Sequence, residues 1–74
     1  MSVIEVVKIN KKVPFEERYK LAQSLKKYRQ RRNMSQEELA QLIGTSVFSV
    51  SRWERAKHYP PRTTLKLMKI IGIL

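Results

Sequence analysis

The sequence contains no cysteine among its 74 residues, which excludes disulfide staples and cysteine-based zinc sites. Glycine is also scarce, with two residues, so no glycine-rich phosphate-binding loop is present. No apolar run approaches the roughly 20 residues of a membrane-spanning helix. The N-terminus lacks the basic-then-apolar layout of a secretory signal. Together these features predict an intracellular, cytoplasmic protein.

Groups that perform catalysis or hold metals are equally few. There are six acidic residues and a single histidine, His58, which precedes a proline-rich loop. Glu37 and Glu38 are adjacent, so they point to different sides of a helix and do not form a paired acid and base. His58 has neither a cysteine nor an acid close by in sequence with which to form a nucleophilic group or a metal site. We therefore expect a binding protein without enzyme activity, metal or cofactor.

The charge is strongly of one sign, with 16 lysines and arginines and a net charge of +10. Such an excess favours a polyanionic partner. An anionic membrane surface fits less well, because the basic residues do not lie opposite a continuous apolar face. The length corresponds to one small domain, whose core supplies only a few kcal/mol, so a second subunit would add stability.

The segment from residue 35 to residue 44 predicts a short helix with clear signals at both ends. Ser35 followed three residues later by Glu38 is a capping-box pattern. Apolar residues at helical spacing then form one face. Gly44 stands where a left-handed residue commonly ends a helix. The apolar face consists of Leu39, Ala40 and Ile43.

A second helix follows at once, with Ser46 as its expected N-cap. Its apolar stripe is Val50 and Trp53. If these two face inward, an unusual mixture of apolar and basic side chains faces outward. Apolar groups can touch thymine methyls and arginine can donate two hydrogen bonds to guanine, so this face suits a DNA reader. The alternative is that the apolar members pack against a partner protein. The outward set is Val47, Phe48, Ser51 and Arg52.

These two helices resemble the helix-turn-helix of the phage lambda repressor/Cro superfamily, also called the Xre family, over about Leu21 to Gly72. The resemblance implies an all-α bundle of about four helices that binds specific double-stranded DNA. It further implies a transcriptional regulator, in particular a repressor, and family members often bind palindromes as homodimers. The matching residues are Gln36, Leu39, Ala40, Gly44, Ser46, Val50, Ser51, Trp53, Glu54 and Lys57.

The resemblance also implies roles for individual side chains. Arg29 would form a partly buried, structural ion pair with Glu54, although a phosphate contact by Arg29 is the alternative. Gln36, at the start of the first motif helix, would hold a phosphate. Base readout is assigned to Val47, Phe48, Ser51 and Arg52. Phosphate contacts are assigned to Gln36, Thr45, Ser46, Ser49, Arg55, Lys57 and His58, with a base contact as the alternative for Ser49.

The flanking segments complete the predicted organisation. Residues 1–13 form an N-terminal arm, and residues 14–74 form the helix-turn-helix domain. Val3 to Ile9 is rich in β-branched residues and predicts a short strand or an extended segment. It would pair with another copy, pack on the helices or stay mobile. Pro14 opens or just precedes the first helix, and Asn33 ends it in left-handed geometry. Inward residues of that helix are Leu21, Ala22, Leu25 and Tyr28.

The last helix is predicted to start at Thr63 or Thr64, after a loop containing two prolines, and to end at Gly72. Its expected core residues are Leu65, Leu67, Met68 and Ile71. The pattern PPRTTLKLMKII is similar to a segment of antitoxin-type members of the superfamily. This similarity keeps open an antitoxin that binds a toxin protein and represses its own operon. A protein-interaction adaptor is a third alternative.

Overall fold

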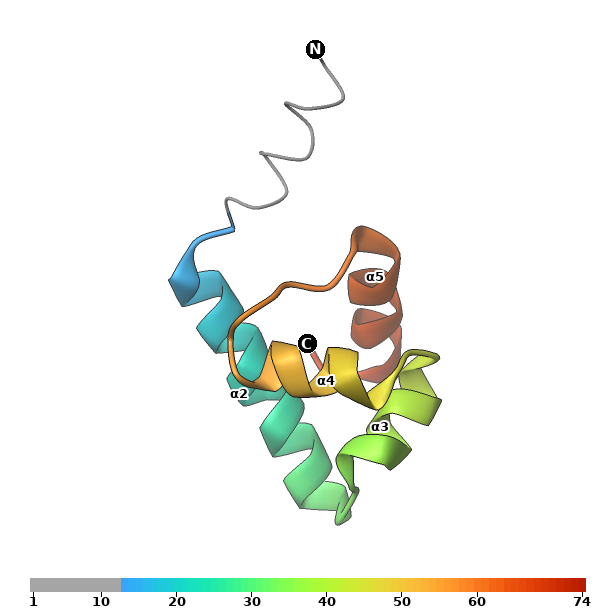
Figure 1. Cartoon of the computed structure of the whole chain (residues 1–74). Coiled ribbons are helices and arrows are strands. Elements are labelled where there is room, and N and C mark those ends of the chain that lie inside the picture. The colour runs from blue at the N-terminus through green and yellow to red at the C-terminus, as the bar shows by residue number, and fades with distance from the viewer. Residues whose placement is uncertain (1–12) are drawn as a thin grey trace.

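The computed structural model describes residues 13–74, which form four helices and no strand. The predicted all-α fold is confirmed. The arm or strand expected at the N-terminus falls, up to residue 12, outside the described residues. Figure 1 shows α4 lying across α2 and α3, and α4 contacts both of these helices. The helices are α2 (Phe15–Arg32), α3 (Gln36–Ile43), α4 (Val47–Glu54) and α5 (Arg62–Ile71).

The ends of α2 follow from local chemistry. Pro14 occupies the N-cap position in extended geometry, where its missing N–H is not needed. Glu16 and Glu17 in the first turn complement the positive end of the helix dipole. Asn33 ends the helix with φ 53°, the left-handed conformation that asparagine tolerates. The predicted start and end of this helix are therefore confirmed.

The two motif helices are capped as the sequence predicted. The Ser35 hydroxyl accepts from the Glu38 amide at 3.0 Å, and the Glu38 carboxylate accepts from the Ser35 amide at 2.8 Å. Gly44 ends α3 with φ 82°, a conformation that costs other residues roughly 1–2 kcal/mol. The Ser46 hydroxyl then accepts from the Ser49 amide at 3.1 Å and starts α4. This short turn fixes the direction in which α4 leaves α3.

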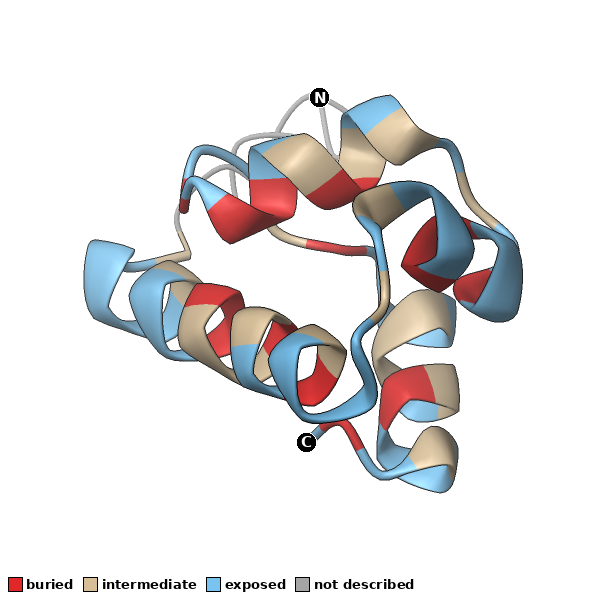
Figure 2. Ribbon diagram, turned by 90° about the horizontal axis from the view of Figure 1, so that it is seen from below, coloured by how far each residue is buried: buried red, intermediate tan, exposed pale blue. Residues whose placement is uncertain are grey.

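The core lies between all four helices, and the buried residues in Figure 2 turn toward the middle of the bundle. Every inward residue predicted for α2, α3 and α4 is buried. In α5, Met68 is fully buried, but the other three predicted core residues are only partly buried. Ile73, which follows the helix, is buried instead. The core cluster is Leu21, Leu25, Tyr28, Leu39, Ala40, Ile43, Val50, Trp53, Met68 and Ile73.

The segment between α4 and α5 departs from the prediction in two ways. The last helix begins at Arg62, so the expected start at Thr63 or Thr64 was wrong. Pro61 takes the N-cap position, because its fixed φ already suits the residue before a helix. Ala56 is buried with φ 60°, a left-handed alanine that no sequence signal indicated. No helix within residues 13–74 is long and apolar enough to cross a membrane.

Candidate nucleic-acid interface

One side of α4 is turned away from the core and carries the residues assigned to base readout. Val50 is fully buried and Trp53 nearly so, which confirms the predicted inward stripe. Phe48 is 73% exposed, although it is a large apolar side chain. Arg52, one helical turn further on, is exposed as well, and Ser51 is partly exposed. Exposure of an aromatic ring next to an arginine provides one apolar and one cationic group on the same surface.

Val47 differs from the other members of the predicted set. It was expected to face outward, but it is partly buried and packs against the core cluster. It is the first residue of α4, directly after the cap Ser46. An apolar residue at this place can pack back onto the preceding turn and core. The outward surface of α4 is therefore dominated by Phe48 and Arg52, with only part of Val47 accessible.

The acidic residue of α4 is removed from this surface by an ion pair. Arg29 of α2 donates through Nε to Glu54 at 2.6 Å and through a terminal nitrogen to the other carboxylate oxygen at 2.8 Å. Its remaining terminal nitrogen donates to the Met34 carbonyl at 3.0 Å. Glu54 is 4% exposed. The pair expected from the family resemblance is thus present, with the two-pronged geometry that makes arginine–carboxylate contacts strong.

Gln36 is a third member of this cluster that the sequence did not reveal. Its side-chain amide donates to Glu54 at 3.0 Å, whereas the family resemblance implies a phosphate contact for that side chain. The bond joins the start of α3 to the end of α4. The hydrogen bonds that Arg29 donates to the Glu54 carboxylate raise the pKa of the Arg29 guanidinium, while burial of the guanidinium acts in the opposite direction. Arg29 therefore stays charged and keeps Glu54 compensated.

The assigned phosphate contacts lie in two places. At the start of α4, the Ser46 hydroxyl donates to the Ser49 hydroxyl at 3.1 Å. This leaves the hydrogen of Ser49, and not that of Ser46, free for another acceptor. Thr45 beside them is partly exposed. After the end of α4, the structure places three exposed basic side chains in sequence, Arg55, Lys57 and His58.

Other kinds of site find little support within residues 13–74. No group of three or more histidine or acidic side chains could hold a metal ion there. The acidic residue within α4, Glu54, accepts hydrogen bonds from Arg29 and Gln36. The geometry therefore presents a cationic and partly apolar helix face flanked by hydroxyl and basic groups. That combination suits the groove and backbone of a nucleic acid.

Comparison with known proteins gives one result. A family model described as helix-turn-helix matches residues 25–68, more than half of the chain. The match includes α3 and α4 entirely, α2 from residue 25 onward and most of α5. It does not separate repressors from antitoxins. No curated protein and no solved structure matched the chain.

Proposed function

Since the chain belongs to the Cro/C1-type, or Xre-like, helix-turn-helix family of DNA-binding transcription regulators, we propose that it is a repressor. It binds a palindromic operator as a homodimer, with α4 of each subunit in the major groove of double-stranded DNA. A repressor of this kind acts by occupying its site, and occupancy requires no catalytic step. The family's domains are regulatory and are not normally enzymes.

The observation that carries the proposal is the pairing of Phe48 and Arg52 on the outward side of α4. Exposing a phenylalanine to water is unfavourable unless a partner covers it. Phe48 is suited to a thymine methyl, and Arg52 to the two acceptors of guanine. Ser51 lies between them in sequence and can bond to several bases. Sequestration of Glu54 by Arg29 keeps a negative charge away from the same surface.

The residues around the turn would hold the protein in register on the phosphates. The first amides of α3 and α4 have no partner within their own helices, apart from those satisfied by Ser35 and Ser46. Helix N-termini attract phosphate groups. Gln36 contributes its backbone amide and its second side-chain N–H, since Glu54 accepts only one. Lys57 and His58 add exposed donors beyond the other end of α4.

Exposed apolar side chains outside α4 support the homodimer. Ile70 of α5 is 82% exposed, and Leu42 of α3 and Leu74 are 44% and 45% exposed. Part of this apolar surface would be buried by contact between two copies. In a symmetric dimer the two recognition helices would lie about 34–36 Å apart, one turn of DNA.

The proposal is tested by selecting bound duplexes from a random pool and then measuring affinities of variants for the selected sequence. We expect a palindromic motif. Arg52→Ala should lose about 1–3 kcal/mol of binding free energy and relax selectivity at one base pair. Lys57→Ala should weaken cognate and random DNA about equally and reduce the slope of affinity against salt.

Lys66→Ala is the control, because Lys66 is exposed on α5 and outside the assigned interface. It should leave base preference unchanged. Equal losses on cognate and random DNA for Arg52→Ala would remove Arg52 from base readout. Selection of no motif, with binding that persists at high salt, would contradict the repressor and favour a protein-docking role for the face of α4.

A further inference from the structure

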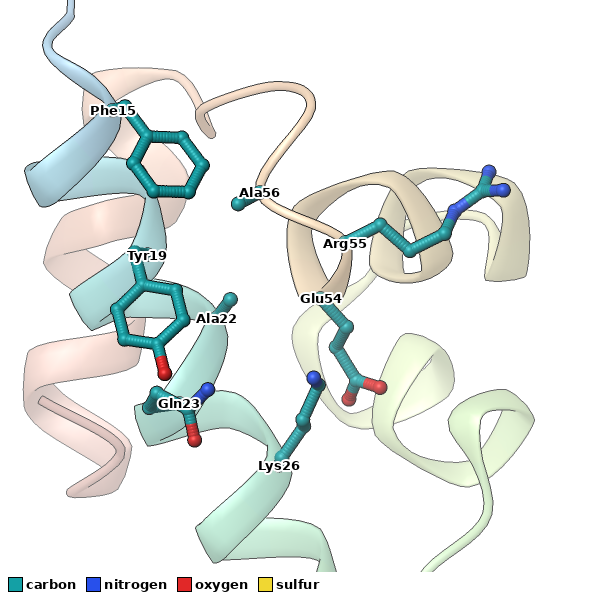
Figure 3. Close-up of a pocket in the computed structure, with 8 residues that line it drawn as sticks. All are labelled: Phe15, Tyr19, Ala22, Gln23, Lys26, Glu54, Arg55 and Ala56. Carbon is teal, nitrogen blue, oxygen red and sulfur yellow. The ribbon is translucent and has the colours of Figure 1, made fainter.

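A cavity of about 220 Å³ lies between the N-terminal half of α2 and the turn that follows α4. Figure 3 shows Phe15 and Tyr19 along one side of it, with Ala56 facing them from the turn. Ala22 lies at the back, and Gln23 and Lys26 continue the α2 wall toward the lower end. The cavity is on a different part of the molecule from the outward side of α4. None of these six residues is assigned to DNA binding.

The size and lining of this cavity indicate the kind of group that fits it. Small-molecule sites usually measure roughly 300–1,000 Å³, so this one is better matched to a single side chain. Phe15 and Tyr19 are stacked with ring centroids 5.9 Å apart, yet they remain 59% and 51% exposed. Exposure of an aromatic pair to water beside a cavity is unfavourable, and an apolar segment that packs against both rings would remove that exposure.

The charged groups around the cavity indicate which charge a segment that docks there should carry. Lys26 stands at the lower end, with its amine directed upward (Figure 3). Glu54 also lines the cavity, but its carboxylate is occupied by Arg29 and Gln36. The guanidinium of Arg55 points away from the cavity. A matching segment should therefore bring apolar side chains for the rings and an acid for Lys26.

We propose that the cavity is the docking site of the chain's own N-terminal segment, residues 3–9, in the same molecule. This segment lies outside the described residues, and its sequence is VIEVVKI. Docked in extended form, the segment would present Glu5, Val7 and Ile9 on one face, because alternate residues of an extended chain share a face. Ile9 covers the two rings, Val7 enters the cavity, and Glu5 pairs with Lys26.

The spacing of the docking side chains in the segment is close to the spacing of their proposed partners on α2. Along α2, Tyr19 and Lys26 are seven residues apart, or about 10–11 Å at 1.5 Å per residue. Between Ile9 and Glu5 an extended chain covers about 13 Å. The five residues from Ile9 to Pro14 can span up to about 17 Å, which is enough to turn back along α2. Because the segment is joined directly to α2, its effective concentration at the cavity is about millimolar, which favours it over a separate peptide.

The test uses the full-length chain in solution and measures nuclear Overhauser effects between the Ile9 methyl groups and the Tyr19 ring. We expect these contacts in the unmodified chain. Val7→Asn should reduce the docked-to-free ratio about tenfold or more, because it removes a buried aliphatic side chain. Val6→Asn, on the opposite face of the segment, is the matched control and should leave the contacts unchanged.

A charge exchange tests the register independently. Glu5→Lys and Lys26→Glu should each lower the docked-to-free ratio by about two- to fivefold, the effect of a half-exposed ion pair, and their combination should restore it. Lys27→Glu, one residue further along α2 and exposed, should neither lower the ratio nor rescue Glu5→Lys. Trp53 fluorescence reports that each variant is folded.

Three results would overturn the proposal. The first is absence of contacts between Ile9 and Tyr19. The second is that Val6→Asn loses the contacts between Ile9 and Tyr19 while Val7→Asn keeps them. The third is that mixed labelled and unlabelled chains show the contacts only between copies, which would assign the cavity to a dimer. None of these outcomes bears on DNA binding by α4, so this inference and the proposed function can fail separately.

Discussion

Phe48 is the most exposed large apolar residue of α4, at 73%. A residue of this kind at the outward start of a recognition helix is available to contact the edge of a base. Thymine is the one base of DNA whose major-groove edge carries a methyl group. If Phe48 covers that methyl, its contribution to binding is hydrophobic and depends on that one carbon atom.

A contact between Phe48 and a thymine methyl predicts a specific response to removing that methyl group from DNA. Replacing the contacted thymine by uracil should cost the unmodified protein about 0.8 kcal/mol, or roughly fourfold in affinity. Phe48→Ala should bind more weakly but should no longer distinguish thymine from uracil. Titration of both proteins with both duplexes gives the comparison. Equal sensitivity of the two proteins to uracil would exclude Phe48 from this contact.

At single positions, the sequence predicted interactions between residues close together in the chain better than interactions between residues far apart in the chain. The inward direction of Val50 and Trp53 follows from helical spacing and is confirmed. The packing of Val47 against the core does not follow from spacing, because it depends on where α4 lies relative to its neighbours. The bond from Gln36 to Glu54 joins residues 18 positions apart, and no pattern in the sequence indicated it.

Between elements, the group formed by Arg29, Glu54 and Gln36 ties together α2, α4 and α3. It lies partly buried at the point where the three helices meet. A buried carboxylate is tolerable only while it is paired and hydrogen-bonded. Loss of the arginine should therefore do more harm than loss of an exposed arginine from the same helix.

Arg29→Ala should lower the free energy of unfolding by about 3 kcal/mol or more, because Glu54 would keep only Gln36 as a partner. Arg31→Ala, in the same last turn of α2 but exposed, should lower it by less than about 1 kcal/mol. Replacing the pair together, with Arg29→Met and Glu54→Leu, should recover much of the loss. Urea unfolding followed by Trp53 fluorescence measures all three. A loss for Arg29→Ala as small as that for Arg31→Ala would show that the pair contributes little.

Helix boundaries set by capping were predictable, and those set by tertiary packing were not. Ser35, Gly44 and Ser46 act through bonds and backbone geometry within four residues of themselves. The left-handed φ of Ala56 has no signal in its residue type, because alanine rarely adopts positive φ. Burial of Ile73 after the end of α5 depends on its packing against the core cluster formed by the other helices. The cavity beside Phe15 could not be predicted either, because its walls come from α2 and from a turn roughly 30–40 residues later in the chain.

At the scale of the whole molecule, the helices hold α4 outward on a basic surface, with a net charge of +10 for the chain. One such domain offers a single short helix to DNA, so a single half-site supplies limited specificity. Two copies related by a two-fold axis would double the contact and require a palindrome. The family match supports double-stranded DNA as the partner, and the dimer remains part of our proposal.

The dimer predicts a strict dependence on the distance between half-sites. Inserting five base pairs at the centre of the selected operator turns one half-site about half a helical turn away, to the opposite side of the duplex. Affinity should then fall to that of a single half-site. The same five base pairs added outside the operator should have no effect, which controls for length and composition. Gel-shift titrations of the three duplexes measure the difference. Unchanged affinity for the central insertion would mean that the subunits bind independently, because a rigid pair cannot place both copies of α4 in grooves that face opposite directions.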